Sequence, residues 1–140
     1  MKPSALVLTA LLLAPAAALA ADSQPTVRTD PVLEQATKTI AAKDWPQAQA
    51  LLKDAIDRNP GNPDYHNLYA YSIRKGANPD MNLVFKHYNE ALRLDPRHRG
   101  AHEYLGEAYL MVGNLPKAKE HLSALDKLCF FPCSEFNELK

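Results

Sequence analysis

The chain has 140 residues, with 16 lysines and arginines against 16 aspartates and glutamates, and therefore no formal net charge. This length suits a single domain. The balanced charge and the lack of a charged tail argue against nucleic acid and against a partner recognised through bulk charge.

The first twenty residues have the order of a secretory signal peptide. A lysine near the start is followed by an apolar run over residues 5–13 and by small residues over 18–21. This run is about half the roughly 20 residues that a membrane-spanning helix requires. We therefore expect a signal peptide over residues 1–20, a flexible polar leader over 21–29, export to the bacterial periplasm, and no stable membrane anchor.

From residue 30 onwards, apolar side chains recur three and four residues apart, which predicts helices instead of strands. Leu68, Tyr69 and Ile73 are one example. Segments that contain proline and glycine separate these stripes, and Asp44 and Ser134 offer polar caps. The expected helices cover residues 31–42, 45–58, 63–75, 81–94, 99–112 and 115–128, followed by a short helix from Ser134.

Small residues recur in two sets at a period close to 34 residues, which indicates two helices in each repeat. The first set is spaced by 34 and 36 residues and the second by 36 and 34: Ala36, Ala70 and Gly106, then Ala48, Val84 and Ala118. One helical hairpin cannot bury its own apolar face, so about three must stack and the ends need covering. The sequence predicts an all-α repeat domain over residues 30–128 with a C-terminal cap over 129–140.

These segments resemble tetratricopeptide repeats (TPRs). The similarity covers residues 30–128 and is fullest at Gly100–Tyr109 and Tyr88–Pro96; it is weaker in the first repeat, where Lys43 replaces the usual turn glycine and Val32 the usual large aromatic residue. The chain is also similar to small exported bacterial TPR proteins of unassigned activity. The resemblance implies a right-handed α-solenoid of about three helix-turn-helix repeats, whose concave face holds a peptide or a helix of another protein.

The resemblance also places the fifth, ninth, and twelfth or thirteenth residues of each first helix in that groove. In the second and third repeats these are Asn67, Tyr71, Arg74, Lys75, Glu103, Glu107 and Leu110. An ordinary solvated face is the alternative interpretation. The acids of the third repeat differ from the lysines and asparagines with which the family clamps a C-terminal carboxylate, so we do not expect that ligand. We assign most aromatic residues to packing, but Tyr71 suits an anchor for a partner.

Two cysteines, Cys129 and Cys133, flank a short loop between the third repeat and the closing helix. In an oxidising compartment we expect a disulfide that anchors this helix and contributes about 2 kcal/mol through loop closure. One alternative is a copper site in which His121 joins the two thiolates. Another is a catalytic dithiol, although its usual spacing has two intervening residues instead of three.

We expect neither an enzyme nor a cofactor. His98 and His102 lie four residues apart, but no glutamate follows His98 as in the zinc metalloprotease motif, so we assign both to solvated or interface positions. The sequence contains no nucleophile elbow or phosphate-binding loop. It predicts an exported adaptor or assembly factor that binds another protein. The alternatives are a metal or thiol-redox carrier using Cys129 and Cys133, and self-association through uncovered ends of the array.

Overall fold

A computed structural model describes residues 29–131 and 133–140. The predicted signal peptide and residues 21–28 of the predicted leader lie outside the described residues. The described part contains seven helices and no strand, and none of these helices is long and apolar enough to cross a membrane. The helices are α1 (Pro31–Ala41), α2 (Trp45–Arg58), α3 (Pro63–Arg74), α4 (Met81–Leu94), α5 (Arg99–Met111), α6 (Leu115–Leu128) and α7 (Ser134–Leu139).

All seven helices begin at the residues that the sequence predicts. The predicted ends at residues 42, 75 and 112 are one residue too long, because these residues are C-caps. Asp44 caps α2 as predicted, since its Oδ1 accepts a hydrogen bond from the Gln47 N–H at 3.2 Å. The predicted cap at Ser134 is wrong, because Ser134 is the first helical residue and Cys133 precedes it without a side-chain cap.

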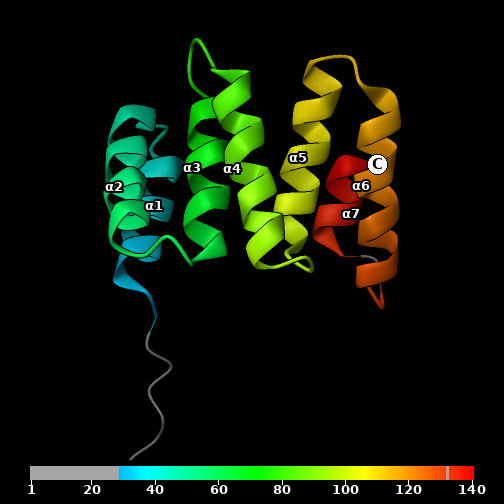
Figure 1. Cartoon of the computed structure of the whole chain (residues 1–140), viewed down its shortest axis with the longest axis horizontal. Coiled ribbons are helices and arrows are strands. Elements are labelled where there is room, and N and C mark those ends of the chain that lie inside the picture. Colours follow the sequence, from blue (N-terminus) through cyan, green and yellow to red (C-terminus); the bar gives the residue numbers. More distant parts are fainter. Residues whose placement is uncertain (1–28, 132) are drawn as a thin grey trace, which may run out of the picture.

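Six of the helices form three hairpins, α1–α2, α3–α4 and α5–α6, that stand side by side along the molecule (Figure 1). The first helices of neighbouring hairpins contact each other, whereas the described second helices α2, α4 and α6 do not. The array therefore curves with α1, α3 and α5 on its inner, concave side. The short α7 packs against α5 and α6 at the C-terminal end (Figure 1). This arrangement confirms the predicted all-α solenoid.

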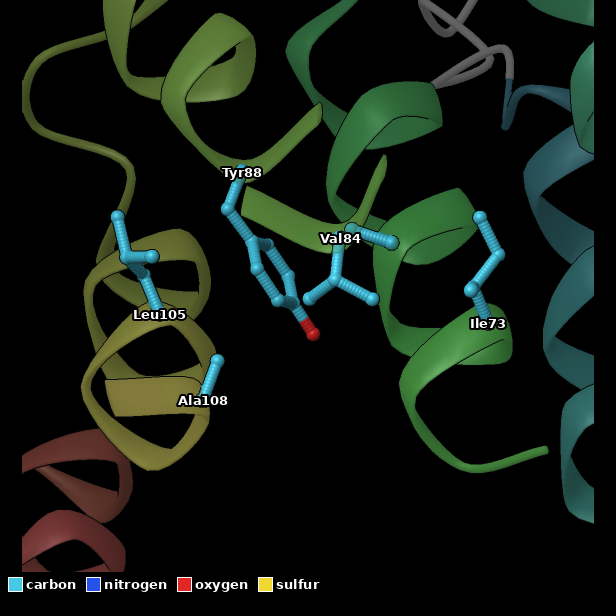
Figure 2. Packing of buried hydrophobic residues seen from close by; sticks show 6 residues of the cluster. Ile73, Val84, Tyr88, Leu105 and Ala108 are labelled. Carbon is cyan, nitrogen blue, oxygen red and sulfur yellow. The ribbon is translucent and has the colours of Figure 1, made fainter. Parts of the chain in front are cut away.

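The small residues that define the repeat are all buried, as their pattern predicts. Between the second and third hairpins, fully buried Tyr88 of α4 lies between Val84 and the α5 residues Leu105 and Ala108 (Figure 2). Leu122 of α6 has the position equivalent to Tyr88 but is only partly buried. The difference arises because no further hairpin of the described residues packs on the third one, and the six-residue α7 covers only part of its end.

Asp30 joins the first repeat to the second. Its Oδ1 caps α1 by accepting hydrogen bonds from the N–H groups of Val32 at 2.8 Å and Leu33 at 3.3 Å. Its Oδ2 accepts a hydrogen bond from the Tyr65 hydroxyl of α3 at 2.6 Å. The Tyr65 bond, helped by the two backbone bonds, lowers the pKa of Asp30 below its usual value.

A close helix contact and a disulfide hold the C-terminal end together. Buried Leu139 of α7 lies directly over Gly106 of α5, where an added Cβ would come within 2.5 Å of Leu139 Cδ2. Gly106 therefore permits the close approach of α7 to α5. Cys129 and Cys133 are bonded to each other between α6 and α7, with their Cα atoms 5.7 Å apart.

Candidate functional site

The predicted groove residues lie on two neighbouring helices of the concave layer, at intervals of about one turn. Those on α3 are Asn67, Tyr71 and Arg74, with Lys75 at its C-cap, and those on α5 are Glu103, Glu107 and Leu110. Lys75 and Leu110 are exposed. Asn67, Arg74 and Glu103 are buried. The buried residues of the predicted groove, which we call its floor, are therefore polar or charged, and two others, Lys75 and Leu110, are open to solvent.

Arg74 forms the centre of this floor, and only 6% of its surface is exposed. Its Nη2 donates a hydrogen bond to Glu107 Oε2 at 2.5 Å, and its Nε donates one to the Tyr88 hydroxyl at 3.2 Å. Its guanidinium carbon lies 5.5 and 5.7 Å from the ring centroids of Tyr71 and Tyr104, which are cation–π distances. Arg74 therefore joins α3, α4 and α5, and Glu107 compensates its charge.

Glu103 lies one turn before Glu107 on α5 but has no such partner. Only 8% of its surface is exposed, and no side chain in the described part of the molecule pairs with its carboxylate. Burial raises the pKa of Glu103 to about 7; the charges of Glu107, Glu135 and Glu138 add to this effect, and Arg74 acts in the opposite direction. In the empty groove this carboxyl group is therefore about half protonated near neutral pH.

Asn67 occupies in α3 the position that Glu103 occupies in α5, 36 residues later. It is 5% exposed, and its Oδ1 is buried without a hydrogen-bond partner among the described residues. An unsatisfied buried acceptor costs roughly 1–3 kcal/mol. Its amide nitrogen lies 3.3 Å from the place that a Cβ on Gly100 would take, so the side chain faces α5.

Apolar side chains line the mouth of the groove. Tyr71 lies between the rings of Trp45 and Tyr104, whose centroids are 6.3 and 4.7 Å away. At the α5–α6 turn, four side chains that we call the apolar strip are 45 to 54% exposed: Leu110, Met111, Val112 and Leu115. The Met111 sulfur lies 3.8 Å from Arg74 Nη1, which places this strip beside the groove floor.

Two pairs of histidines, which the sequence interpretation missed, link the helices within the second and third hairpins. The Nδ1 atoms of His66 on α3 and His87 on α4 are 2.9 Å apart, and those of His102 on α5 and His121 on α6 are 3.0 Å apart. His66 and His102 are 36 residues apart, and His87 and His121 are 34 apart. These are the spacings of the repeat, so the sequence did contain a signal for the two pairs.

The hydrogen bonds define which nitrogen carries the proton in each pair. The ring on the first helix also bonds through Nε2 to the carbonyl of a proline six residues earlier, at 2.9 Å from His66 and 3.1 Å from His102. A carbonyl can only accept, so Nε2 donates and Nδ1 accepts from the partner ring. Burial lowers the pKa of His87 and of His121 to about 4, and the charge of the partner histidine adds to this effect.

The structure places the two histidines that we assigned to solvated or interface positions. His102 is half-buried and bonded to His121, which leaves His121 engaged on α6. His98 caps α5, because its Nδ1 accepts a hydrogen bond from the Ala101 N–H at 3.1 Å. Its Nε2 lies 3.0 Å from Asp64 Oδ1, and this hydrogen bond lowers the pKa of Asp64.

The predicted alternatives at the two cysteines need free thiolates. The structure bonds Cys129 to Cys133, so neither sulfur is a thiolate in this form. Over residues 29–131 and 133–140, no group of three or more histidine, cysteine, aspartate and glutamate side chains is arranged to hold a metal ion.

Comparison with known proteins places this geometry among repeat proteins. No family model matches the chain. A curated protein, the TPR repeat-containing thioredoxin TTL4 of Arabidopsis thaliana, is 33% identical over 78 residues, which are 56% of this chain. The chain spans only 11% of the length of that relative.

Three solved structures share the solenoid at low sequence identity. MamA from Desulfovibrio magneticus RS-1 is 16% identical with a TM-score of 0.63, over 69% of this chain and 54% of that one. The TPR2B domain of yeast Sti1 in complex with an Hsp70 peptide is 21% identical with a TM-score of 0.63, over 71% and 81%. The Yersinia enterocolitica chaperone SycD with a peptide of the translocator YopD is 15% identical with a TM-score of 0.66, over 78% and 81%.

Proposed function

We propose that this chain, which has the fold of a tetratricopeptide-repeat solenoid, is a protein–protein interaction module that binds a peptide or a helix of another protein along its concave face. Two of the solved structures that share its fold, Sti1 TPR2B and SycD, carry a bound peptide. In this proposal the protein is an exported adaptor or assembly factor without enzymatic activity, and it acts in the bacterial periplasm.

The apolar strip is the observation that carries this proposal. Contiguous exposed apolar side chains on a soluble domain mark sites of interaction. Here four exposed apolar side chains occur within residues 110–115, and one of them, Met111, lies against Arg74; most large apolar residues of the second and third hairpins are buried or partly buried. Tyr71, held between two other aromatic rings beside this strip, offers a rigid amphipathic contact for a partner.

The charges of the groove favour one class of segment over another. Arg74 is neutralised by Glu107, and Glu103, with the nearby α7 acid Glu138, leaves unpaired acids at this face of α5. An acidic C-terminal segment would meet like charge there, and like charges at an interface cost several kcal/mol. We therefore propose a ligand other than a C-terminal carboxylate.

The periplasmic location rests on the sequence of residues 1–20 and is supported by the chemistry of the cysteines. A disulfide such as Cys129–Cys133 persists in an oxidising compartment and is rare in the cytosol. We do not extend the proposal to copper or thiol-redox transport, because His121 is bonded to His102 and the two sulfur atoms are bonded to each other.

Photocrosslinking in the native cell envelope tests the proposal. A photoreactive phenylalanine analogue at Tyr71 should yield one discrete protein adduct, and Leu110→Asp should abolish it by placing a charge in the apolar strip. The same analogue at Lys119, exposed on α6 of the outer layer, is the matched control and should give no such adduct. Failure to form an adduct from either Tyr71 or Glu107 would contradict the proposed groove. The N-terminal mass of the exported protein tests cleavage before Ala21.

A further inference from the structure

Glu103 is a buried acid without a counterion, and this requires an explanation. A buried ionised carboxylate costs several kcal/mol unless a cation or several donors satisfy it. The charged groups around it are Glu107 on its own helix, Glu135 and Glu138 on α7, and Arg74 on α3. Arg74 is committed to Glu107. Arg99 lies 3.6 Å from Glu135, so no basic side chain of the described residues pairs with Glu103 or Glu138.

Asn67 provides a second, independent sign of a missing group. The Oδ1 atom of Asn67 has no hydrogen-bond partner among the described residues, and this side chain faces Gly100 of α5. Gly100 lies about one turn before Glu103, on the same face of α5. An unpartnered amide oxygen and an unpaired acid that is 8% exposed thus occur along one seam between α3 and α5. Three donors on an ammonium group, or five on a guanidinium group, can satisfy an amide oxygen and a carboxylate together.

We infer that the seam between α3 and α5, at Glu103 and Asn67, binds the lysine or arginine side chain of a protein segment held in the groove. This inference rests on the proposed function and names the chemistry of its ligand. Glu107 and Glu135 already pair with Arg74 and Arg99. The unpaired Glu138 of α7 adds negative charge near Glu103, which favours a bound cation.

The apolar strip sets the spacing of the second contact. Leu110 lies seven residues beyond Glu103 on α5, which corresponds to about 10 Å along the helix axis. A partner that uses both sites therefore carries a basic and an apolar side chain about 10 Å apart. This distance corresponds to seven residues in a helix or three in an extended segment.

The first experiment observes the carboxyl carbon of Glu103 by NMR in protein labelled with ¹³C-glutamate, using n-butylammonium as the probe. A bound cation favours the ionised acid, so the pKa of Glu103 should fall by about one unit or more at saturation. Sodium chloride at equal ionic strength should not reproduce this shift. An equal shift with both salts would overturn the inference. Glu120→Gln, which changes an exposed acid on α6, should preserve the shift of the Glu103 pKa.

The second experiment separates the cation site from the groove itself. A short extended peptide with a leucine and an arginine three residues apart is compared with the same peptide carrying norleucine for arginine. We expect the norleucine peptide to bind at least about tenfold more weakly to the native protein, and Glu103→Gln to remove the difference. Equal binding of the two peptides would overturn the cation site and leave the proposed groove intact. No binding by either peptide would also overturn it, and the crosslink from Tyr71 would then decide the proposed function.

Discussion

Arg74 of α3 and Glu107 of α5 form the ion pair that joins the second hairpin to the third across the groove floor, with 2.5 Å between Nη2 and Oε2. The side chain of Arg74 is 5% exposed and that of Glu107 is 32% exposed. The pair explains why two acids one turn apart are tolerated on α5: one of them neutralises a buried guanidinium. The other acid, Glu103, has no basic partner among the described residues, and it is the residue at which we propose that a cation binds.

Glu107→Gln should lower the free energy of unfolding by about 2–3 kcal/mol, because it leaves a buried guanidinium without its counterion. Urea denaturation at pH 7 measures this change. Glu120→Gln, which removes an exposed acid paired with Lys117 on α6, is the matched control and should cost less than about 0.5 kcal/mol. Equal effects of the two substitutions would show that the groove pair contributes no more than a surface pair.

Glu103→Gln should stabilise the protein at alkaline pH. Because the pKa of Glu103 is raised from 4.5 to about 7 in the folded state, its stability contribution is fully present below pH 4.5 and is lost as pH rises through 7. The melting temperature of the variant should therefore exceed that of the native protein at pH 8.5, and the gap should close towards pH 4.5. A gap that is constant from pH 4.5 to 8.5 would contradict a raised pKa at this carboxyl group.

The histidine pairs should make the protein less stable at acidic pH, whereas Glu103 lowers its stability at alkaline pH. The pKa of His121 is lowered from 6.5 to about 4 in the folded state, so stability is fully present above pH 6.5 and is lost as pH falls to about 4. His121→Gln supplies an amide N–H that can donate to His102, and it removes the titratable imidazole. Its stability should therefore depend less on pH between 6.5 and 4 than that of the native protein. NMR titration of His87 and His121 in the folded protein checks the cause, and pKa values near 6.5 would refute it.

The periodic features of the sequence predicted the fold well, because they act locally. Helix starts, turn segments and the small residues of the repeat depend on spacing along the chain, and Ala36, Ala70 and Gly106 are buried as expected. The groove positions on α3 and α5 came from the resemblance to the family, and they stay a prediction. The sequence did not indicate that Arg74 is neutralised within the groove floor, since this depends on the distance between two helices of different hairpins.

The missed features share a physical cause, which is contact between elements. The spacing of residues along α5 predicts that Glu103 lies on a solvent-exposed face. In the structure, burial and the neighbouring acids, including two on α7, raise its pKa. His66 and His87 are unremarkable in isolation, and their pairing needs both helices of a hairpin and the carbonyl of the preceding turn. The apolar pattern of one helix does not predict contacts between side chains of two helices. The recurrence of the histidines at the repeat spacing, however, would have allowed the two pairs to be predicted.

Lys43 and Gly113 lie in the turns of the first and third hairpins and allow a comparison of backbone strain. Both adopt left-handed backbone angles, with φ of 57° at Lys43 and 74° at Gly113. A residue with a Cβ pays about 1–2 kcal/mol in this region, whereas glycine does not. Lys43→Gly should therefore raise the free energy of unfolding by about 1 kcal/mol. Gly113→Ala should lower it by a similar amount, since an added Cβ meets no atom within 4 Å and only the backbone is strained. Chemical denaturation of the two variants measures both signs, and a loss of stability in Lys43→Gly would contradict the strain.

Gly106→Ala should loosen α7, because the new Cβ would lie 2.5 Å from Cδ2 and 3.2 Å from Cγ of Leu139. Overpacking costs about 1–3 kcal/mol, and the higher helix propensity of alanine returns up to about 1 kcal/mol. We therefore expect a net loss of about 1 kcal/mol, with faster amide hydrogen exchange in α7 than in α3. Leu139→Ala removes the clashing atoms, so Gly106→Ala combined with Leu139→Ala should be more stable than the sum of the two single changes predicts. If the changes in the free energy of unfolding were strictly additive, Gly106 and Leu139 would not be in contact. The burial of Glu103 near the acids of α7 would then need another explanation.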